Sequence, residues 1–317
     1  MDKITLGYAP TRRSIFSAPD ALKYRNLTKK CLEELGVNIV DIDDINAEGL
    51  LYDMNDAPRI IEKFSAAGVD GLFFPHCNFG MEYAVADLAR NMGLPVLLWG
   101  PRDERPDAAG IRLRDSQCGL FATGKALRRF RTPFTYMTNC RLEDPEFRRG
   151  LNVFLRVCNV VKVFRRIRIL QISTRPYDFL TTMCNEGELL EQFNIQLAPI
   201  PMTELVEAFE AVKGSDETRE VAALIRERME IKTGEEVIPK VAALKTAMKA
   251  LAAKYGCNAA AIQCWNALQS EIGIMPCAAN SLLTGEGIPV VCETDIHGAV
   301  TSLMVQAAGL GQEDIMF

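Results

Sequence analysis

The first hundred residues alternate short apolar runs with amphipathic stretches, and this alternation limits the folds that the chain can adopt. The apolar runs are Ile4–Tyr8, Val37–Ile42, Gly71–Pro75 and Val96–Trp99. Apolar strands without polar alternation are typical of a parallel sheet that is covered on both faces. Right-handed crossovers between such strands give a doubly wound layer, so we predict an α/β fold of this kind for the first part of the chain.

The stretches between these runs have the spacing of helices. Their apolar residues recur every three or four positions: Tyr24, Leu27, Cys31 and Leu35 in one stretch, and Met81, Val85, Leu88 and Met92 in the next. These stripes predict helices that pack on a sheet through one face. A further helix is predicted to begin at Asp144, because an aspartate cap followed by a proline suits the first helical turn.

A second series of strand-like runs begins near residue 168. The runs are Ile169–Ser173, Gln196–Pro201, Ala260–Trp265 and Pro289–Thr294. We therefore predict two doubly wound, mostly parallel α/β domains, an N-terminal one over residues 1–165 and a second over residues 166–317. The long charged stretch 216–254 is predicted to be the helical crossover of the second domain.

The composition excludes several classes of protein. The chain has 36 Lys and Arg residues against 41 Asp and Glu residues, a formal net charge of −5, so no global basic field exists to bind nucleic acid or an anionic membrane. The beginning of the chain lacks the pattern of a signal peptide, and no run of about 18 apolar residues is present. We expect a soluble, cytoplasmic protein without nucleic-acid or membrane partners.

Cysteine and histidine usage restricts the metal chemistry. The ten cysteines are scattered without a CxxC pair, which favours reduced and mostly buried thiols over a disulfide framework. Only two histidines occur, His76 and His297, so this chain alone cannot form a multi-histidine zinc site. Any metal site must depend on carboxylates. The phosphate-binding loop, the dinucleotide-binding glycine pattern and the serine-hydrolase elbow are also absent, which leaves the ends of the strands as candidate sites.

The segment from Pro289 to Ala299 is the strongest candidate for chemistry. Four apolar residues lead into Glu293, Asp295 and His297, which are spaced by two. Two acids and an imidazole at the end of a buried strand offer hard oxygen ligands and a titratable nitrogen. The alternative is purely structural: Asp295 would cap the helix that follows.

Polar residues also follow other predicted strands. Gln263 lies in an otherwise apolar run, where it could bind a sugar hydroxyl or satisfy a nearby backbone group. In the first domain, His76 follows one strand, and Arg12 and Arg13 follow another. A capped loop histidine and solvated arginines are the alternatives at those positions.

Several segments together resemble the L-fucose/L-arabinose isomerase family. They are STRPYDFL, NEGELLEQF, IPMTELVEAF, AAIQCW with its Gln263, and CETDIHGA, in that order. The resemblance implies that the two α/β units correspond to the N-terminal and middle domains of the family, and that its C-terminal β-rich domain is absent. Residues 313–317, which resemble the start of another strand, give a second reason to expect an incomplete chain.

The resemblance also implies a manganese site. Glu293 matches the family's metal-ligating glutamate, whereas the aspartate and histidine ligands of the family would fall beyond Phe317. Asp295 matches an acid beside the site, and Gln263 matches a glutamine that contacts substrate. Cys77 stands where the family has an aromatic residue, which leaves the sugar open.

Arg12 or Arg13 matches an arginine that, in this family, reaches the active site of a neighbouring subunit. The resemblance therefore implies a homo-oligomer.

These observations predict a metal-dependent aldose–ketose isomerase that acts through an ene-diol, with Mn²⁺ or another divalent cation as cofactor and a small sugar as substrate. Glu293 is the predicted metal ligand and candidate base, and this chain by itself is expected to be inactive. The main alternative is a sugar-binding module without catalysis. A nicotinamide-dependent oxidoreductase would share only the doubly wound pattern and lacks its glycine fingerprint.

Overall fold

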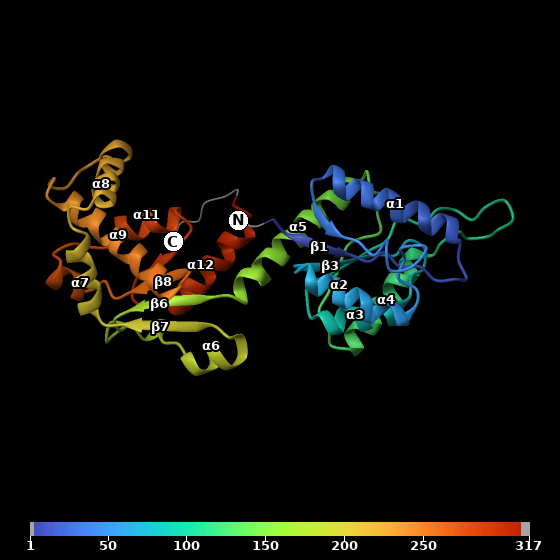
Figure 1. The fold of residues 1–317 in the computed structure, drawn as a ribbon, viewed down its shortest axis with the longest axis horizontal. Helices are drawn as coiled ribbons and strands as arrows, with labels where there is room; N and C mark the ends of the chain where they lie inside the picture. Colours follow the sequence, from blue (N-terminus) through green and yellow to red (C-terminus); the bar gives the residue numbers. More distant parts are fainter. Residues whose placement is uncertain (1–2, 312–317) are drawn as a thin grey trace. The chain divides into compact units, whose positions relative to one another are not determined.

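The structure, a computed structural model, describes residues 3–311 (Figure 1). They form two compact units that are divided between Val161 and Lys162. The division falls inside helix α5 (Pro145–Phe164), and the boundary predicted at residue 165 lies just after that helix. The strand start predicted over residues 313–317 lies outside the described residues. No helix within residues 3–311 is long and apolar enough to cross a bilayer.

Unit 1 contains a five-stranded parallel sheet with the strand order β2-β1-β3-β4-β5. The strands are β1 (Thr5–Tyr8), β2 (Asn38–Val40), β3 (Gly71–Pro75), β4 (Val96–Trp99) and β5 (Thr135–Tyr136). Besides α5, the helices are α1 (Ala18–Glu34), α2 (Ala57–Ala66), α3 (Glu82–Met92) and α4 (Ser116–Arg129), with a short 3₁₀ helix at Met54–Asp56. The sequence did not predict β5, because two residues are too few to show a period.

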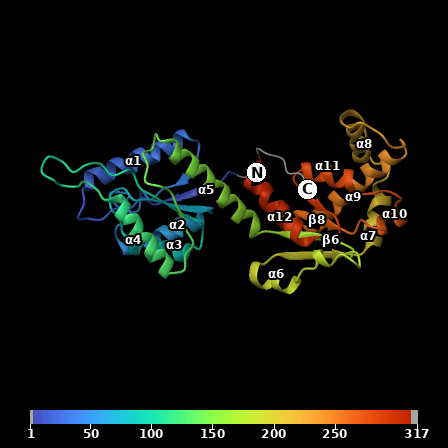
Figure 2. The ribbon, with the colours of Figure 1, turned by 180° about the vertical axis from the view of Figure 1, so that it is seen from behind.

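Neighbouring residues of the strands in unit 1 belong to different hydrophobic cores. Phe73 packs with residues of α1 and α5, whereas Leu72 and Phe74 pack with residues of α2, α3 and α4. Figure 2 shows these two groups of helices on opposite sides of the sheet. Burial on both faces explains why the strands read as continuous apolar runs.

Unit 2 contains a four-stranded parallel sheet with the order β7-β6-β8-β9. The strands are β6 (Arg168–Ile172), β7 (Gln196–Ile200), β8 (Ala259–Ile262) and β9 (Val290–Val291). The helices are α6 (Glu186–Phe193), α7 (Met202–Val212), α8 (Asp216–Arg228), α9 (Val237–Tyr255), α10 (Ala267–Glu271), α11 (Cys277–Gly285) and α12 (Ile296–Ala308), with a 3₁₀ helix at Leu180–Thr182. The predicted fold class, two doubly wound parallel α/β domains, is confirmed.

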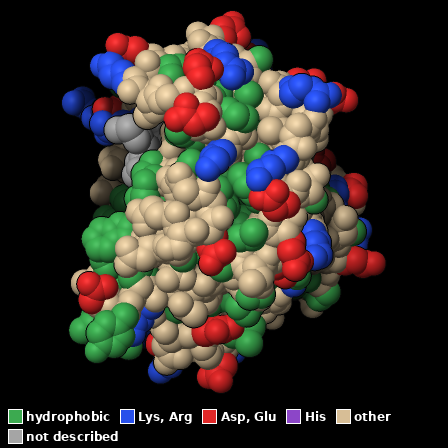
Figure 3. Space-filling view, turned by 90° about the vertical axis from the view of Figure 1, so that its left-hand side faces the viewer, with side chains coloured by type: hydrophobic (Ala, Val, Ile, Leu, Met, Phe, Trp, Pro, Cys, Tyr) green, Lys and Arg blue, Asp and Glu red, His purple; other side chains and the backbone are tan. Residues whose placement is uncertain are grey.

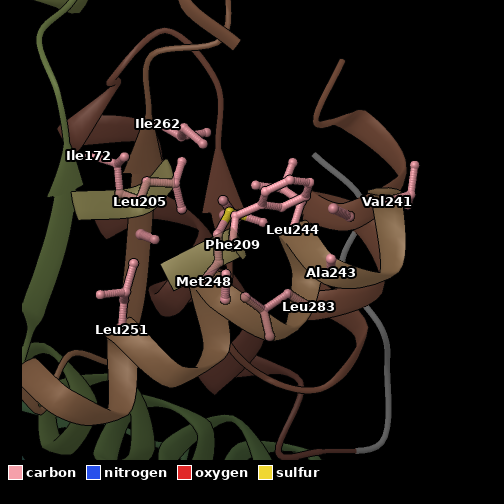
Figure 4. Packing of buried hydrophobic residues seen from close by; sticks show 14 of the residues in the cluster. Ile172, Leu205, Phe209, Val241, Ala243, Leu244, Met248, Leu251, Ile262 and Leu283 are labelled. Carbon is pink, nitrogen blue, oxygen red and sulfur yellow. The ribbon is translucent and has the colours of Figure 1, made fainter. Parts of the chain in front are cut away.

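The larger core of unit 2 lies between the sheet and helices α7, α8, α9 and α11. Figure 4 shows Phe209 of α7 next to Leu244 and Met248 of α9, and Leu205 of α7 next to Ile172 of β6. The opposite face of the sheet is covered by α6 and α12. The stretch 216–254 was predicted as one helical region but forms two helices, because α8 ends at Arg228 and the next residue, Met229, is extended.

The exposed surface agrees with the balanced composition. On the face shown in Figure 3, acidic and basic side chains are interspersed among hydrophobic ones, without an extended patch of one charge.

A close helix–loop contact in unit 1 fixes the segment that follows β3. A Cβ atom added at Gly119 of α4 would lie 1.7 Å from the carbonyl oxygen of Phe79. Because that oxygen belongs to the backbone, neither side can yield easily, and only glycine permits α4 to lie this close to the loop.

We therefore expect Gly119→Ala to lower the free energy of unfolding by at least about 2 kcal/mol, measured by denaturant unfolding. Gly285→Ala is the matched control, since no atom lies within 4 Å of the Cβ position at Gly285. This control should be neutral or slightly stabilising, as is usual for alanine in a helix. Equal stability of both variants would contradict the prediction.

Candidate active site

The ends of β6, β8 and β9 bring polar residues together at one edge of the unit 2 sheet. Ser173 follows β6, Gln263 follows β8, and Glu293 lies two residues after β9. Backbone hydrogen bonds continue past the strands: the amide of Gln263 donates to Ile172 O at 3.1 Å, and that of Thr294 donates to Ile262 O at 3.2 Å. The carboxyl edge of a parallel sheet is where open α/β proteins bind their ligands.

The backbone at this edge leaves the strand conformation abruptly. Ser173, Glu293 and Thr294 have φ angles of 66°, 55° and 54°, in the left-handed region that side-chain-bearing residues rarely adopt. Non-glycine residues in this region persist where their surroundings hold them, and they are frequent at functional sites. The strand predicted to run to Thr294 therefore ends at Val291.

Gln263 is held by a serine that the sequence analysis did not single out. Ser173 Oγ donates a hydrogen bond to Gln263 Oε1 at 2.7 Å. This contact fixes which end of the amide faces Ser173. Within the described part of the chain, Gln263 Nε2 has no hydrogen-bond partner, so it is free to donate to a ligand oxygen.

Glu293 is held by a buried cysteine. Cys264 Sγ donates to Glu293 Oε2 at 2.5 Å, and only 1% of Cys264 is exposed. Burial, together with the hydrogen bond to the carboxylate, raises the pKa of Cys264 to about 12. The thiol therefore stays protonated near neutral pH and donates its hydrogen bond to Glu293 Oε2. The other carboxylate oxygen, Oε1, has no hydrogen-bond partner among residues 3–311.

Trp265 adds an aromatic surface next to these groups. It follows Cys264 directly, is 45% exposed, and packs edge-on against Phe179 with ring centroids 5.0 Å apart. The signal for Ser173, Cys264 and Trp265 in the sequence was their position at the ends of the strand-like runs Ile169–Ser173 and Ala260–Trp265. Sequence patterns do not show which of these neighbours hydrogen-bond across strands.

Asp295 has the capping role that the sequence left as an alternative. Its Oδ1 accepts a hydrogen bond from the amide of Gly298 at 2.9 Å, at the N-cap of α12. His297 lies in the first turn of α12 with an exposed side chain. Neither residue contacts Glu293 through a hydrogen bond in the described structure.

Arg12 and Arg13 belong to unit 1 and already have partners there. Arg12 binds both carboxylate oxygens of Glu48, at 2.5 and 2.9 Å, and lies over the ring of Tyr52. Arg13 Nε donates to Gly80 O at 3.1 Å, and its guanidinium lies over the ring of Phe79. Both arginines are therefore held by contacts within unit 1, and their predicted role at an active site stays a prediction.

Unit 2 also contains a cavity that none of these candidate site residues lines. It has a volume of about 670 Å³ and lies among the end of α8, the start of α9 and the segment 269–278. Its lining is mostly apolar and includes Met229, Ile231 and Met275. Neither Gln263, Cys264 nor Glu293 lines it.

The described residues do not by themselves fit a divalent cation. Within residues 3–311, no three His, Cys, Asp or Glu side chains lie close enough together to hold a metal ion. At the edge of the sheet, Glu293 is paired with a protonated thiol, and Asp295 caps a helix. A hard cation such as Mn²⁺ prefers several oxygen ligands, so one carboxylate is insufficient. Manganese dependence stays a prediction.

Comparison with known proteins identifies the family. Residues 7–165 match the model of the fucose/sulfoquinovose isomerase N-terminal domain. The chain belongs to the fucose/sulfoquinovose isomerase family. The isomerase resemblance seen in the sequence is confirmed, although the family model names sulfoquinovose where the sequence suggested arabinose.

Similar proteins agree with this family assignment. The chain is 26% identical to a sulfoquinovose isomerase of Alkalicoccus urumqiensis, over 98% of this chain and 68% of that protein. It is 22% identical to a sulfoquinovose isomerase of Priestia megaterium, over 96% of this chain and 67% of that protein. A sugar-binding transport protein from Actinobacillus succinogenes is 13% identical with a TM-score of 0.23, which is too low to support an argument.

In this member of the fucose/sulfoquinovose isomerase family, the histidine after β3 is a structural group. His76 is fully buried, with Nδ1 3.1 Å from Phe74 O and Nε2 2.8 Å from Thr123 Oγ1. Burial lowers its pKa from 6.5 to about 4. The ring is therefore neutral near pH 7.

Between about pH 6.5 and pH 4, the unfolded chain binds a proton at His76 and the folded chain does not. The free energy of unfolding of unit 1 should therefore fall as the pH decreases through this window, by about 3 kcal/mol for the full shift. Denaturant unfolding at several pH values measures this slope. His76→Gln should flatten it, whereas the same substitution at the exposed His297 should not. An unchanged slope in His76→Gln would show that another group is responsible.

Proposed function

We propose that Glu293 is the proton-transferring base of an aldose–ketose isomerase. The observation that supports this most directly is the Cys264–Glu293 hydrogen bond at the carboxyl edge of the unit 2 sheet. It holds one carboxylate oxygen and leaves the other available. Family membership supplies the reaction class, and the Gln263–Ser173 pair supplies an oriented amide beside the base.

The reaction requires a proton to move between two neighbouring carbons. In an open-chain aldose, Glu293 Oε1 would take the proton from C2, while the electrons of that bond form a C1–C2 double bond and O1 takes a proton from a water molecule, which gives the ene-diol. O2 then returns a proton to the hydroxide so formed as the C2 carbonyl appears, and the acid form of Glu293 gives its proton to C1, which yields the ketose. The atoms balance without any external oxidant.

Gln263 would bind a sugar oxygen through Nε2, since its Oε1 is occupied by Ser173. Cys264 is a positioning residue, because its thiol touches the base and not the sugar. Trp265, the next residue after Cys264, has a partly exposed ring that would pack against the sugar. Together these residues would orient the sugar and hold the base within reach of C2.

The substrate class follows from the relatives, which are named sulfoquinovose isomerases. We propose a sulfonated aldose of that type. A metal dependence and a homo-oligomer remain part of the proposal, so assays should include Mn²⁺.

Replacing the proposed base tests the function. Glu293→Gln keeps the size of the side chain but cannot accept the proton, so ketose formation from sulfoquinovose should fall by about 100-fold or more. Glu271→Gln, an exposed glutamate in α10, is the matched control and should retain full activity. Turnover of Glu293→Gln within a few-fold of the unsubstituted protein would overturn the proposal.

The Ser173–Gln263 contact predicts a separate effect on binding. Ser173→Ala removes the donor that orients the Gln263 amide, which is worth about 1 kcal/mol. KM should therefore rise about 5-fold with little change in kcat. Ser270→Ala, which removes a hydroxyl that bonds only to Asn266 O, is the control. A fall in kcat without a change in KM would contradict a substrate-orienting role.

A further inference from the structure

Unit 1 contains a polar cavity of about 360 Å³ beyond the ends of β4 and β5. The loop after β4, the first turn of α4 and the segment from β5 onward line it, with the residues Arg102, Asp103, Gln117, Tyr136, Thr138 and Asn139. This position is again the carboxyl edge of a parallel sheet. None of the residues considered in the sequence or in the proposed reaction belongs to it.

A buried acceptor in this cavity has no donor. Asn139 Nδ2 donates to Gly100 O at 2.8 Å and to Pro101 O at 3.2 Å. These two bonds fix the amide, because rotation by half a turn would place its oxygen against two carbonyl oxygens. Asn139 Oδ1 is buried and lacks a hydrogen-bond partner. The two donated bonds therefore hold this wall of the cavity in place.

A guanidinium at the same cavity is also available. The Arg102 side chain is exposed and makes no hydrogen bond or ion pair within residues 3–311. Its backbone is nonetheless anchored, since its amide donates to Cys140 O at 3.2 Å and its carbonyl accepts from Arg114 at 3.1 Å.

Asp103, the carboxylate that lines the cavity, makes no ion pair with Arg102 in the described part of the chain. Asp103 accepts hydrogen bonds from the amides of Ser116 and Gln117, at 2.8 and 3.0 Å, at the start of α4. Its Oδ1 also lies 3.9 Å from Arg114 Nε, but Arg114 pairs more closely with Asp20 and Glu104. Negative charge therefore remains close to any bound anion and opposes a doubly charged group. The cavity therefore favours a monoanion, such as a sulfonate, over a phosphate dianion.

We propose that this cavity binds a hydroxylated organic monoanion of the size of a sugar. Arg102 binds the anionic group, since guanidinium pairs with such oxygens through two hydrogen bonds. Gln117 and Thr138, whose side chains are exposed at the cavity, bind the hydroxyls of the ligand. The choice of a sulfonated sugar as ligand rests on the proposed function, whereas the site itself does not involve Glu293.

Calorimetric titration with the methyl glycoside of sulfoquinovose tests the site. This probe cannot open its ring, so it cannot be isomerised, and its binding is distinguishable from failure of the proposed reaction. We expect it to bind the full chain, and Arg102→Ala to weaken binding by at least about 10-fold. Arg105→Ala, an exposed arginine on the same loop that does not line the cavity, should leave binding unchanged.

Two further probes separate the contributions of the anion and the hydroxyls. Methyl glucoside lacks the sulfonate and ethanesulfonate lacks the hydroxyls, so both should bind at least about 10-fold more weakly. Equal binding of either probe would overturn the proposal, as would equal effects of Arg102→Ala and Arg105→Ala. Absence of binding of the methyl glycoside at about 10 mM would also overturn it. Unchanged thermal unfolding of Arg102→Ala confirms that the variant is folded.

Discussion

Parallel strand pairing is the constraint on which both sites of this molecule depend. Every strand of a parallel sheet ends at the same edge, so the residues that follow neighbouring strands must lie near one another. In unit 2, backbone hydrogen bonds from Gln263 to Ile172 and from Thr294 to Ile262 continue the parallel pairing beyond the ends of the strands. The edge is thereby rigid enough to hold side chains in fixed relation, even where β9 contributes only two residues.

Hydrogen bonding decides which of the polar groups at these edges remain available. Arg12 and Asp295 are polar residues at strand ends, yet their hydrogen bonds go to Glu48 and to a helix amide. Among residues 3–311, Glu293 and Gln263 are held on one side only, by Cys264 and Ser173, and each keeps an atom without a partner on the other side. A group that is oriented and still lacks a hydrogen-bond partner is suited to binding or catalysis, because no further free energy is needed to order its side chain when the ligand binds.

Each unit has its own candidate site, and the two sites differ in chemistry. The edge in unit 2 offers a carboxylate and an amide, which suit proton transfer on a neutral part of a sugar. The cavity in unit 1 offers Arg102, Gln117 and Thr138, which suit an anion with hydroxyls.

The sequence by itself determined the class of fold, because burial on both faces of a parallel sheet leaves an apolar run that can be read directly, as in β3 and β4. It also placed Gln263 and Glu293 at strand ends and indicated the isomerase family. Only the tertiary structure decided that Cys264 holds Glu293, that Ser173 orients Gln263, and that Asn139 lacks a donor. The first two contacts join residues that are 29 and 90 positions apart, and the third feature is a missing partner. Local periodicity carries no information about long-range contacts or about missing partners.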